Sequence, residues 1–137
     1  MDKAVSLRIE HECAKLVHRF CVLVDAYRHE ELAALWAHDA VWETWRGPVR
    51  GRDEIRVYLE AKARTDVTIH IAHNVIIDVE DERNASGTAV FTYHGTKRGD
   101  PASLTPRVVG RYFDRFVLTD EGWRFAHRRT EMTFTAS

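Results

Sequence analysis

The chain has 137 residues, of which 45% are hydrophobic and 30% are charged, and its formal net charge is −1. This balance is typical of a water-soluble folded domain and provides no general attraction to nucleic acid or to a membrane surface. No apolar run reaches the roughly 20 residues that cross a bilayer, and the charged N-terminus lacks the apolar core of a signal peptide. We therefore expect one cytoplasmic domain over residues 1–137, without nucleic-acid or membrane partners.

The first half of the chain is predicted to be mainly helical. Apolar residues recur at three- and four-residue spacing from Leu7 to Arg28, and Ser6 could cap this helix. A shorter helix is expected at about Glu30–Ala37. The alternation over Ala40–Trp45 then predicts a strand, followed by a turn and a brief return strand. A third helix is expected from Gly51 to about Ala63.

From Val67 onward the period is that of β-strands. Four long strands are predicted at about Val67–Val79, Gly87–Thr96, Arg107–Leu118 and Trp123–Phe134, and the glycine and prolines of Lys97–Pro106 indicate a loop. Short connections between consecutive strands favour antiparallel pairing. We therefore predict an α+β fold in which a curved antiparallel sheet, four long strands plus a short hairpin, wraps on three N-terminal helices and leaves a pocket between the layers.

Asp25 lies near the end of the first predicted helix, on the same side as Val17, Cys21 and Val24. A carboxylate on an apolar stripe is unfavourable unless it has a partner. His70, inside an apolar strand, is a suitable partner, because a buried carboxylate can orient an imidazole that takes up a proton near neutral pH. The pair predicts a general base. The alternative is that Asp25 caps local backbone groups and His70 is an ordinary core histidine.

Arg128 and Arg129 are neighbours in the last predicted strand, so strand alternation puts them on opposite faces and at most one points inward. An inward Arg128 could stabilise a negatively charged oxygen during a reaction. The alternative is an ion pair with Asp114 or Glu131.

Other side chains could line the pocket. Alternation places Asn74 on the face of His70, where its amide could donate to a substrate oxygen or satisfy a buried strand end. Aromatic residues could contact a ligand or simply pack in the core. The predicted ligand-binding residues are Phe20, Trp42, Asn74, Tyr93 and Tyr112.

Nothing in the sequence predicts a metal or another cofactor. Eight histidines are present, but no two of them show metal-ligand spacing together with a carboxylate. There is no glycine-rich phosphate loop and no nucleophile elbow. Cys13 and Cys21 lie eight residues apart on one predicted helix, too far for a disulfide, and are expected to be buried, reduced thiols.

The order and spacing of several motifs resemble the SnoaL-like branch of the ketosteroid-isomerase-like, or nuclear-transport-factor-like, cone fold. The resemblance covers about residues 6–134. The segments that carry it are Phe20–Asp25 with Leu32–Trp36 and Asp39–Trp42, Val49–Ile55, His70–Val75, and Gly110–Asp114 with Gly122–Phe125 and Arg128. The resemblance implies a cone-shaped sheet that encloses one apolar pocket.

Within this family the pattern is most similar to scytalone dehydratase and hexachlorocyclohexane dehydrochlorinase, which pair a helix aspartate with a strand histidine as the base. Asp25 and His70 match these positions, and Arg128 resembles an arginine of the dehydrochlorinase. Phe20 stands where the dehydrochlorinase has a lysine, so dehalogenation is not expected. The resemblance implies a cofactor-independent dehydratase, isomerase or cyclase that acts on a small, largely apolar cyclic or aromatic molecule.

Two alternatives remain open at this level. The same cone could bind a ligand without transforming it or serve as an oligomerisation module, or it could be an accessory subunit of a larger enzyme. Self-association as a dimer or trimer is expected in every case, because an open sheet face with aromatics such as Phe113, Phe116 and Phe134 needs cover.

Overall fold

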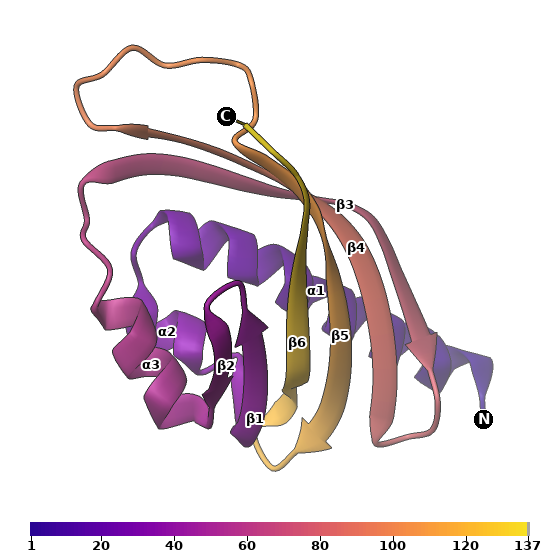
Figure 1. Ribbon diagram of the computed structural model, residues 1–137. Helices are drawn as coiled ribbons and strands as arrows, with labels where there is room; N and C mark the ends of the chain where they lie inside the picture. The colour runs from indigo at the N-terminus through magenta and orange to yellow at the C-terminus, as the bar shows by residue number, and fades with distance from the viewer. Residues whose placement is uncertain (137) are drawn as a thin grey trace.

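Three helices pack on one side of a curved six-stranded sheet, so the α+β prediction is confirmed (Figure 1). The computed structural model describes residues 1–136, and Ser137, which the predicted domain includes, lies outside them. The elements are α1 (Lys3–Asp25), α2 (His29–Ala33), β1 (Trp36–Thr44), β2 (Gly47–Arg50), α3 (Arg52–Glu60), β3 (Asp66–Val79), β4 (Asn84–Lys97), β5 (Val108–Thr119) and β6 (Gly122–Thr135).

The strands follow the order β2-β1-β6-β5-β4-β3. The consecutive pairs from β3 to β6 are antiparallel, as the short connections predict, and β2 pairs back on β1. The remaining pair, β1 with β6, is parallel and sets Trp42 opposite Arg128. Turn signals concern only neighbouring segments, so they do not predict this pairing between the first and the last strand of the chain.

Several helix boundaries differ from the predicted ones, and α1 and α3 each end about three residues early, at Asp25 and Glu60. Helix α1 begins earlier because the carboxylate of Asp2, not Ser6, caps it by accepting a hydrogen bond of 3.0 Å from the backbone N–H of Ala4. Helix α2 ends at Ala33 because the chain is drawn into the sheet at once: the Leu35 carbonyl accepts from the Phe125 N–H at 2.8 Å, and Trp36 is fully buried.

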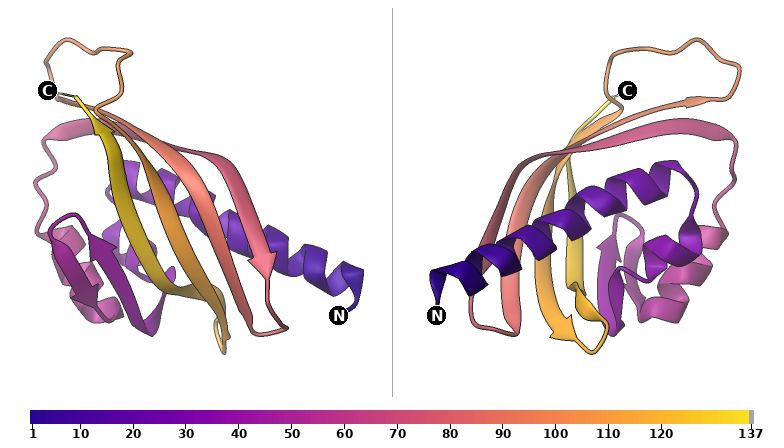
Figure 2. Two further views of the ribbon diagram at one scale, coloured as in Figure 1. Left: turned by 45° about the vertical axis from the view of Figure 1, so that its right-hand side comes forward. Right: turned by 180° about the vertical axis from the view of Figure 1, so that it is seen from behind.

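Helix α1 crosses the concave face of the sheet diagonally, and α2 and α3 cover the end near β1 and β2 (Figure 2). The apolar stripe of α1 packs into the core, as is typical of an amphipathic helix. The core residues contributed by α1 are Ile9, Cys13, Leu16, Val17, Phe20 and Cys21. Because the buried stripe runs to the C-terminal end of the helix, Asp25 is brought against β3. Among residues 1–136, no helix is long and apolar enough to cross a membrane.

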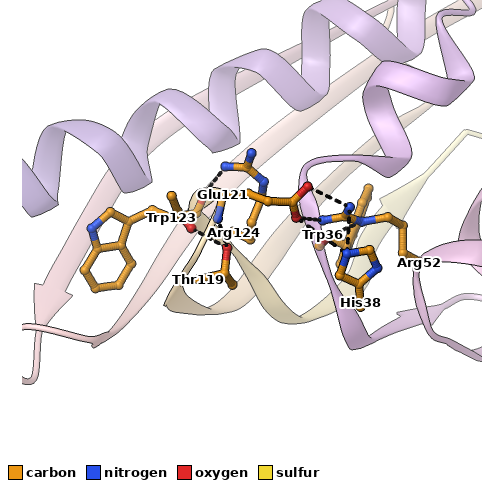
Figure 3. A network of polar contacts seen from close by, with 8 residues as sticks. Trp36, His38, Arg52, Thr119, Glu121, Trp123 and Arg124 are labelled. Atoms are coloured by element: carbon orange, nitrogen blue, oxygen red, sulfur yellow. Dashed lines mark hydrogen bonds and ion pairs between the residues drawn. The ribbon is translucent and has the colours of Figure 1, made fainter.

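A polar network attaches α3 to the far end of the sheet (Figure 3). The Arg52 guanidinium donates to the Trp36 carbonyl at 2.8 Å and to the Glu121 carboxylate at 2.7 Å, and it contacts a ring nitrogen of His38 at 3.3 Å. The hydrogen bond from Arg52 lowers the pKa of Glu121. Arg52 opens α3 and Glu121 lies in the β5–β6 turn, so the network fixes the helix that leads into the pocket-lining segment 61–65.

The outer face of the sheet carries exposed apolar side chains on β3, among them Ile69 and Ile71, and Phe134 is exposed near the end of β6. Phe116, which the sequence analysis placed on an open face, is instead buried in the core. Phe113 is half-covered by the guanidinium of Arg129, 4.1 Å from its ring centroid. The self-association expected from this face stays a prediction.

Candidate functional site

A pocket of about 710 Å³ lies between the helices and the concave face of the sheet. This volume is in the range of small-molecule sites. Its aromatic walls are formed by Phe20, Tyr27, Trp42, Trp45, Tyr58, Phe91, Tyr93 and Tyr112. The polar and charged side chains that border it are Thr44, His29, Arg46, Lys62, Thr65, Asp66, Thr68, His70 and Thr130. Four of the predicted ligand-binding residues therefore line the pocket.

Asp25 and His70 are in direct contact. One carboxylate oxygen of Asp25 lies 2.7 Å from Nδ1 of His70 and accepts a hydrogen bond of 2.9 Å from the Thr68 hydroxyl. The other oxygen accepts from the backbone N–H of His70 at 2.8 Å. Because an ionised carboxylate can only accept, Nδ1 carries the hydrogen and the Nε2 lone pair of a neutral ring is left free. Nε2 has no hydrogen-bond partner within residues 1–136, and His70 borders the pocket, whereas Asp25 lies behind it.

The residues immediately after Asp25 keep the end of α1 in position against β3. The Tyr27 hydroxyl donates to the backbone carbonyl of Asp66 at 2.8 Å, which ties the end of α1 to the start of β3. Tyr27 adopts a left-handed conformation with a φ of 56°, uncommon for a residue other than glycine. Such strain persists where the surrounding contacts demand it and is frequent near functional sites. Asp66 precedes Thr68 by two residues and His70 by four, so this hydrogen bond lies next to both partners of the Asp25 carboxylate.

Aromatic rings lie beside the imidazole and behind it. Tyr93 pairs with His70 across the β3–β4 ladder, and their ring centroids are 4.8 Å apart. Burial raises the pKa of Tyr93, so its phenol remains a hydrogen-bond donor at neutral pH. Tyr112 stacks on Phe91 with centroids 4.3 Å apart, and burial raises its pKa strongly. Phe20 presents its edge to His70 at 6.3 Å. These rings keep water away from one side of the imidazole.

The expectation that Asn74 shares the face of His70 is wrong. A β-bulge interrupts the pairing of β3 with β4 between His73 and Ile76, and Asn74 adopts a left-handed φ of 50° within it. The bulge turns Val75 toward the core and leaves Asn74 exposed and away from the pocket. Strict alternation therefore holds only up to the bulge, which sequence periodicity does not reveal.

Arg128 points inward but does not border the pocket, which corrects the expectation that it faces a ligand. Its Nε and Nη2 donate to the two carboxylate oxygens of Asp114 at 2.7 and 2.9 Å. The guanidinium also lies over the rings of Tyr112 at 3.7 Å and Phe20 at 4.5 Å, which separate it from the pocket. Burial raises the pKa of Asp114, and the charge of Arg128 acts against this rise. The ion pair considered as an alternative is thus present, in the core instead of on the surface.

His29, Lys62 and Arg46 border the pocket but were not singled out by the sequence analysis. His29 is buried, and neither of its ring nitrogens has a hydrogen-bond partner within residues 1–136. It lies in a short helix next to Arg28, Glu30 and Glu31, a charged run that is typical of a solvated surface. Five helical residues are too few for periodicity to show which side is buried.

Replacing His29 with Leu is expected to stabilise the fold, by about 1 kcal/mol at neutral pH, because it removes an unpaired buried polar group. Burial lowers the pKa of His29 below its ordinary value of about 6.5. The unfolded chain therefore binds a proton that the folded chain does not, and stability is lost as the pH falls below that value. Urea unfolding at roughly pH 7.5 and pH 5 should show that the free energy of unfolding falls less in His29→Leu than in wild type. Exposed His11→Leu is the control, and equal losses in the two variants would contradict the prediction.

Neither cysteine is a reactive nucleophile, and the described part of the structure shows no metal site. Both cysteines are buried and unbonded, and burial raises the pKa of the Cys21 thiol to about 11. Such a thiol is protonated and unreactive at neutral pH. No group of three His, Cys, Asp or Glu side chains within residues 1–136 could hold a metal ion.

Comparisons with known proteins agree with this architecture. A family model described as a SnoaL-like domain matches residues 5–129. A provisionally assigned scytalone dehydratase from Novosphingobium aromaticivorans is 24% identical with a TM-score of 0.86, and the match covers 98% of this chain and 91% of that one. A hexachlorocyclohexane dehydrochlorinase from Novosphingobium barchaimii is 18% identical with a TM-score of 0.83, with 98% and 93% covered.

A protein of unknown function from Mycobacterium tuberculosis is 25% identical with a TM-score of 0.77, and 88% of this chain and 73% of that chain are covered. No curated protein matches the chain. Identities this low show a shared fold, and the resemblance to the cone fold inferred from the motifs is confirmed. The chemistry has to be argued from the site itself.

Proposed function

Because the chain belongs to the SnoaL-like domain family, which includes dehydratases and dehydrochlorinases, we propose that it is a cofactor-independent acid–base enzyme. Its reaction would be a dehydration, isomerisation or cyclisation that begins with removal of a proton from a small cyclic or aromatic molecule. The observation that carries the proposal is the contact of 2.7 Å between Asp25 and Nδ1 of His70, on an imidazole that borders the pocket and whose other nitrogen has no hydrogen-bond partner within residues 1–136.

In the proposed mechanism, Nε2 of His70 takes a proton from a carbon next to a carbonyl group, and the C–H electron pair moves into an enolate. Asp25 stabilises the imidazolium that forms and keeps the ring in the correct tautomer. In a dehydration, the imidazolium then returns the proton to a leaving hydroxyl, which departs as water. In an isomerisation, the proton goes back to another carbon of the same molecule. Neither route requires an oxidant or a reductant.

Tyr93 is the best-placed donor for the enolate oxygen. It lies beside His70, borders the pocket and has a pKa raised by burial, so its phenol keeps the proton that it would share. A donor in an aromatic pocket stabilises a developing negative charge more than one in water does. We assign this role to Tyr93 and not to Arg128, because Arg128 is paired with Asp114 behind the aromatic wall.

The test is hydrogen exchange at an acidic carbon. Cyclic ketones of two-ring size, such as 1-tetralone and 2-tetralone, are incubated with the protein in D₂O, and deuterium uptake is followed by NMR. Wild type should exceed the buffer rate, and His70→Gln should lose about 10²-fold or more of that excess. His73→Gln is the matched control, because His73 lies on the same strand but is exposed and bonds Thr92. Full exchange by His70→Gln would overturn the proposal, and ketone binding without exchange would indicate a binding module.

A further inference from the structure

Two exposed cationic side chains border the pocket. Arg46 lies in the β1–β2 turn with its guanidinium 4.6 Å from the Trp45 ring centroid. Lys62 follows α3, and its Nζ lies 4.9 Å from the Tyr58 ring and 5.9 Å from the Trp42 ring. Within residues 1–136, neither cation is in an ion pair with a carboxylate. Aromatic faces hold both side chains in place and leave their N–H donors free.

The charges at this rim are unbalanced. Partial burial of the Lys62 ammonium against aromatic rings lowers its pKa, although the residue as a whole is exposed, and the positive charge of Arg46 lowers it further. Asp66 is the one carboxylate that borders the pocket in the described chain, and it accepts from the Thr65 hydroxyl at 3.4 Å, not from either cation. Both side chains are exposed, so water screens part of this repulsion, and an anion bound between them would relieve the rest.

We propose that Arg46 and Lys62 form an anion-binding subsite at the rim, and that the ligand is a cyclic or aromatic molecule with one anionic substituent such as a carboxylate. Its ring would lie among Trp42, Tyr58 and Phe20, and its anionic group would reach the two cations. Orientation of an acidic carbon toward His70 rests on the proposed function, but the subsite does not. The ligand would then be amphiphilic. This restricts the class of ligand expected from the sequence, a largely apolar molecule, to those that also carry a negative charge.

Two fluorescent probes with the same aromatic frame separate charge from shape: 8-anilinonaphthalene-1-sulfonate and the neutral N-phenyl-1-naphthylamine. Both are titrated into wild type, where they should compete for one site. In the double variant Arg46→Gln/Lys62→Gln, the Kd of the sulfonate should rise about tenfold, as expected for loss of a charge-assisted contact. The Kd of the neutral probe should stay within about twofold, because its aromatic contacts remain.

The control is Lys15→Gln/Arg19→Gln, which removes the same two charges from exposed positions on α1 that do not border the pocket. Its sulfonate affinity should stay near that of wild type. An equal loss in the control pair, an equal loss for the neutral probe, or failure of the probes to compete would overturn the subsite. Binding of the neutral probe without binding of the sulfonate would also overturn the subsite, but the acid–base proposal would stand if ketone exchange is observed. Loss of exchange with sulfonate selectivity intact would overturn only the acid–base proposal.

Discussion

Asp25→Asn is expected to lower the rate of His70-dependent proton exchange by about 10²–10⁴-fold. An asparagine amide has one oxygen and one NH₂ group in place of two acceptor oxygens. Its oxygen is expected to accept from the His70 backbone N–H, because the opposite orientation would set two donors against each other. Its NH₂ group then replaces the oxygen that contacts both Nδ1 and the Thr68 hydroxyl. The ring would turn to the tautomer that carries hydrogen on Nε2, which cannot take a proton from a substrate. The imidazolium would also lose its anionic partner.

The measurement is the exchange rate at saturating ketone in D₂O, together with the Kd of N-phenyl-1-naphthylamine. The dye affinity should stay within about twofold, because Asp25 lies behind the pocket wall and the substitution preserves volume. Asp66→Asn is the matched control. Asp66 lies on β3, the strand of His70, and its carboxylate borders the pocket but does not contact His70. Should Asp25→Asn exchange as fast as wild type, the carboxylate would have no part in the chemistry.

Arg128→Met is expected to destabilise the fold by about 3–5 kcal/mol, because it leaves the buried carboxylate of Asp114 without its cation. Arg128 is 0% exposed and Asp114 is 4% exposed, so water cannot replace the lost hydrogen bonds. The guanidinium also packs on Tyr112, Phe20 and Phe125, and methionine restores only part of those contacts. The double variant Arg128→Met/Asp114→Leu should recover most of the loss, because both members of the pair become apolar.

Urea unfolding measures these differences. Arg129→Met is the control: Arg129 is the next residue, is exposed and pairs with Glu131 on the surface, so its loss should cost less than about 1 kcal/mol. If Arg128→Met does not fold, the double variant still decides the matter, because it should fold with near wild-type stability. Equal losses in Arg128→Met and Arg129→Met, or a double variant as unstable as the single one, would contradict the buried-pair account.

Local patterns were sufficient for most of the fold and for the centre of the site. The apolar stripe of α1 and the alternation of β3 to β6 are properties of neighbouring residues, so they can be read along the chain. Asp25 was found because a carboxylate on such a stripe needs a partner, and His70 because it stands in an apolar strand. In the structure the carboxylate and imidazole are 2.7 Å apart.

Other features depend on which distant segments meet. The bulge that exposes Asn74 follows from the fit of β3 to its partner strand, and the aromatic layer over Arg128 is contributed by α1, β5 and β6. His29 is buried only because the whole fold closes over a short polar helix. Arg46 and Lys62 lie sixteen residues apart and meet at one rim through the packing of α3 on β1 and β2. The sequence by itself thus determined most of the elements and made Asp25 and His70 candidate partners, since these follow from residue chemistry, local spacing and the family resemblance. Only the tertiary structure decided what surrounds that pair, because burial and charge proximity arise from contacts that periodicity does not encode.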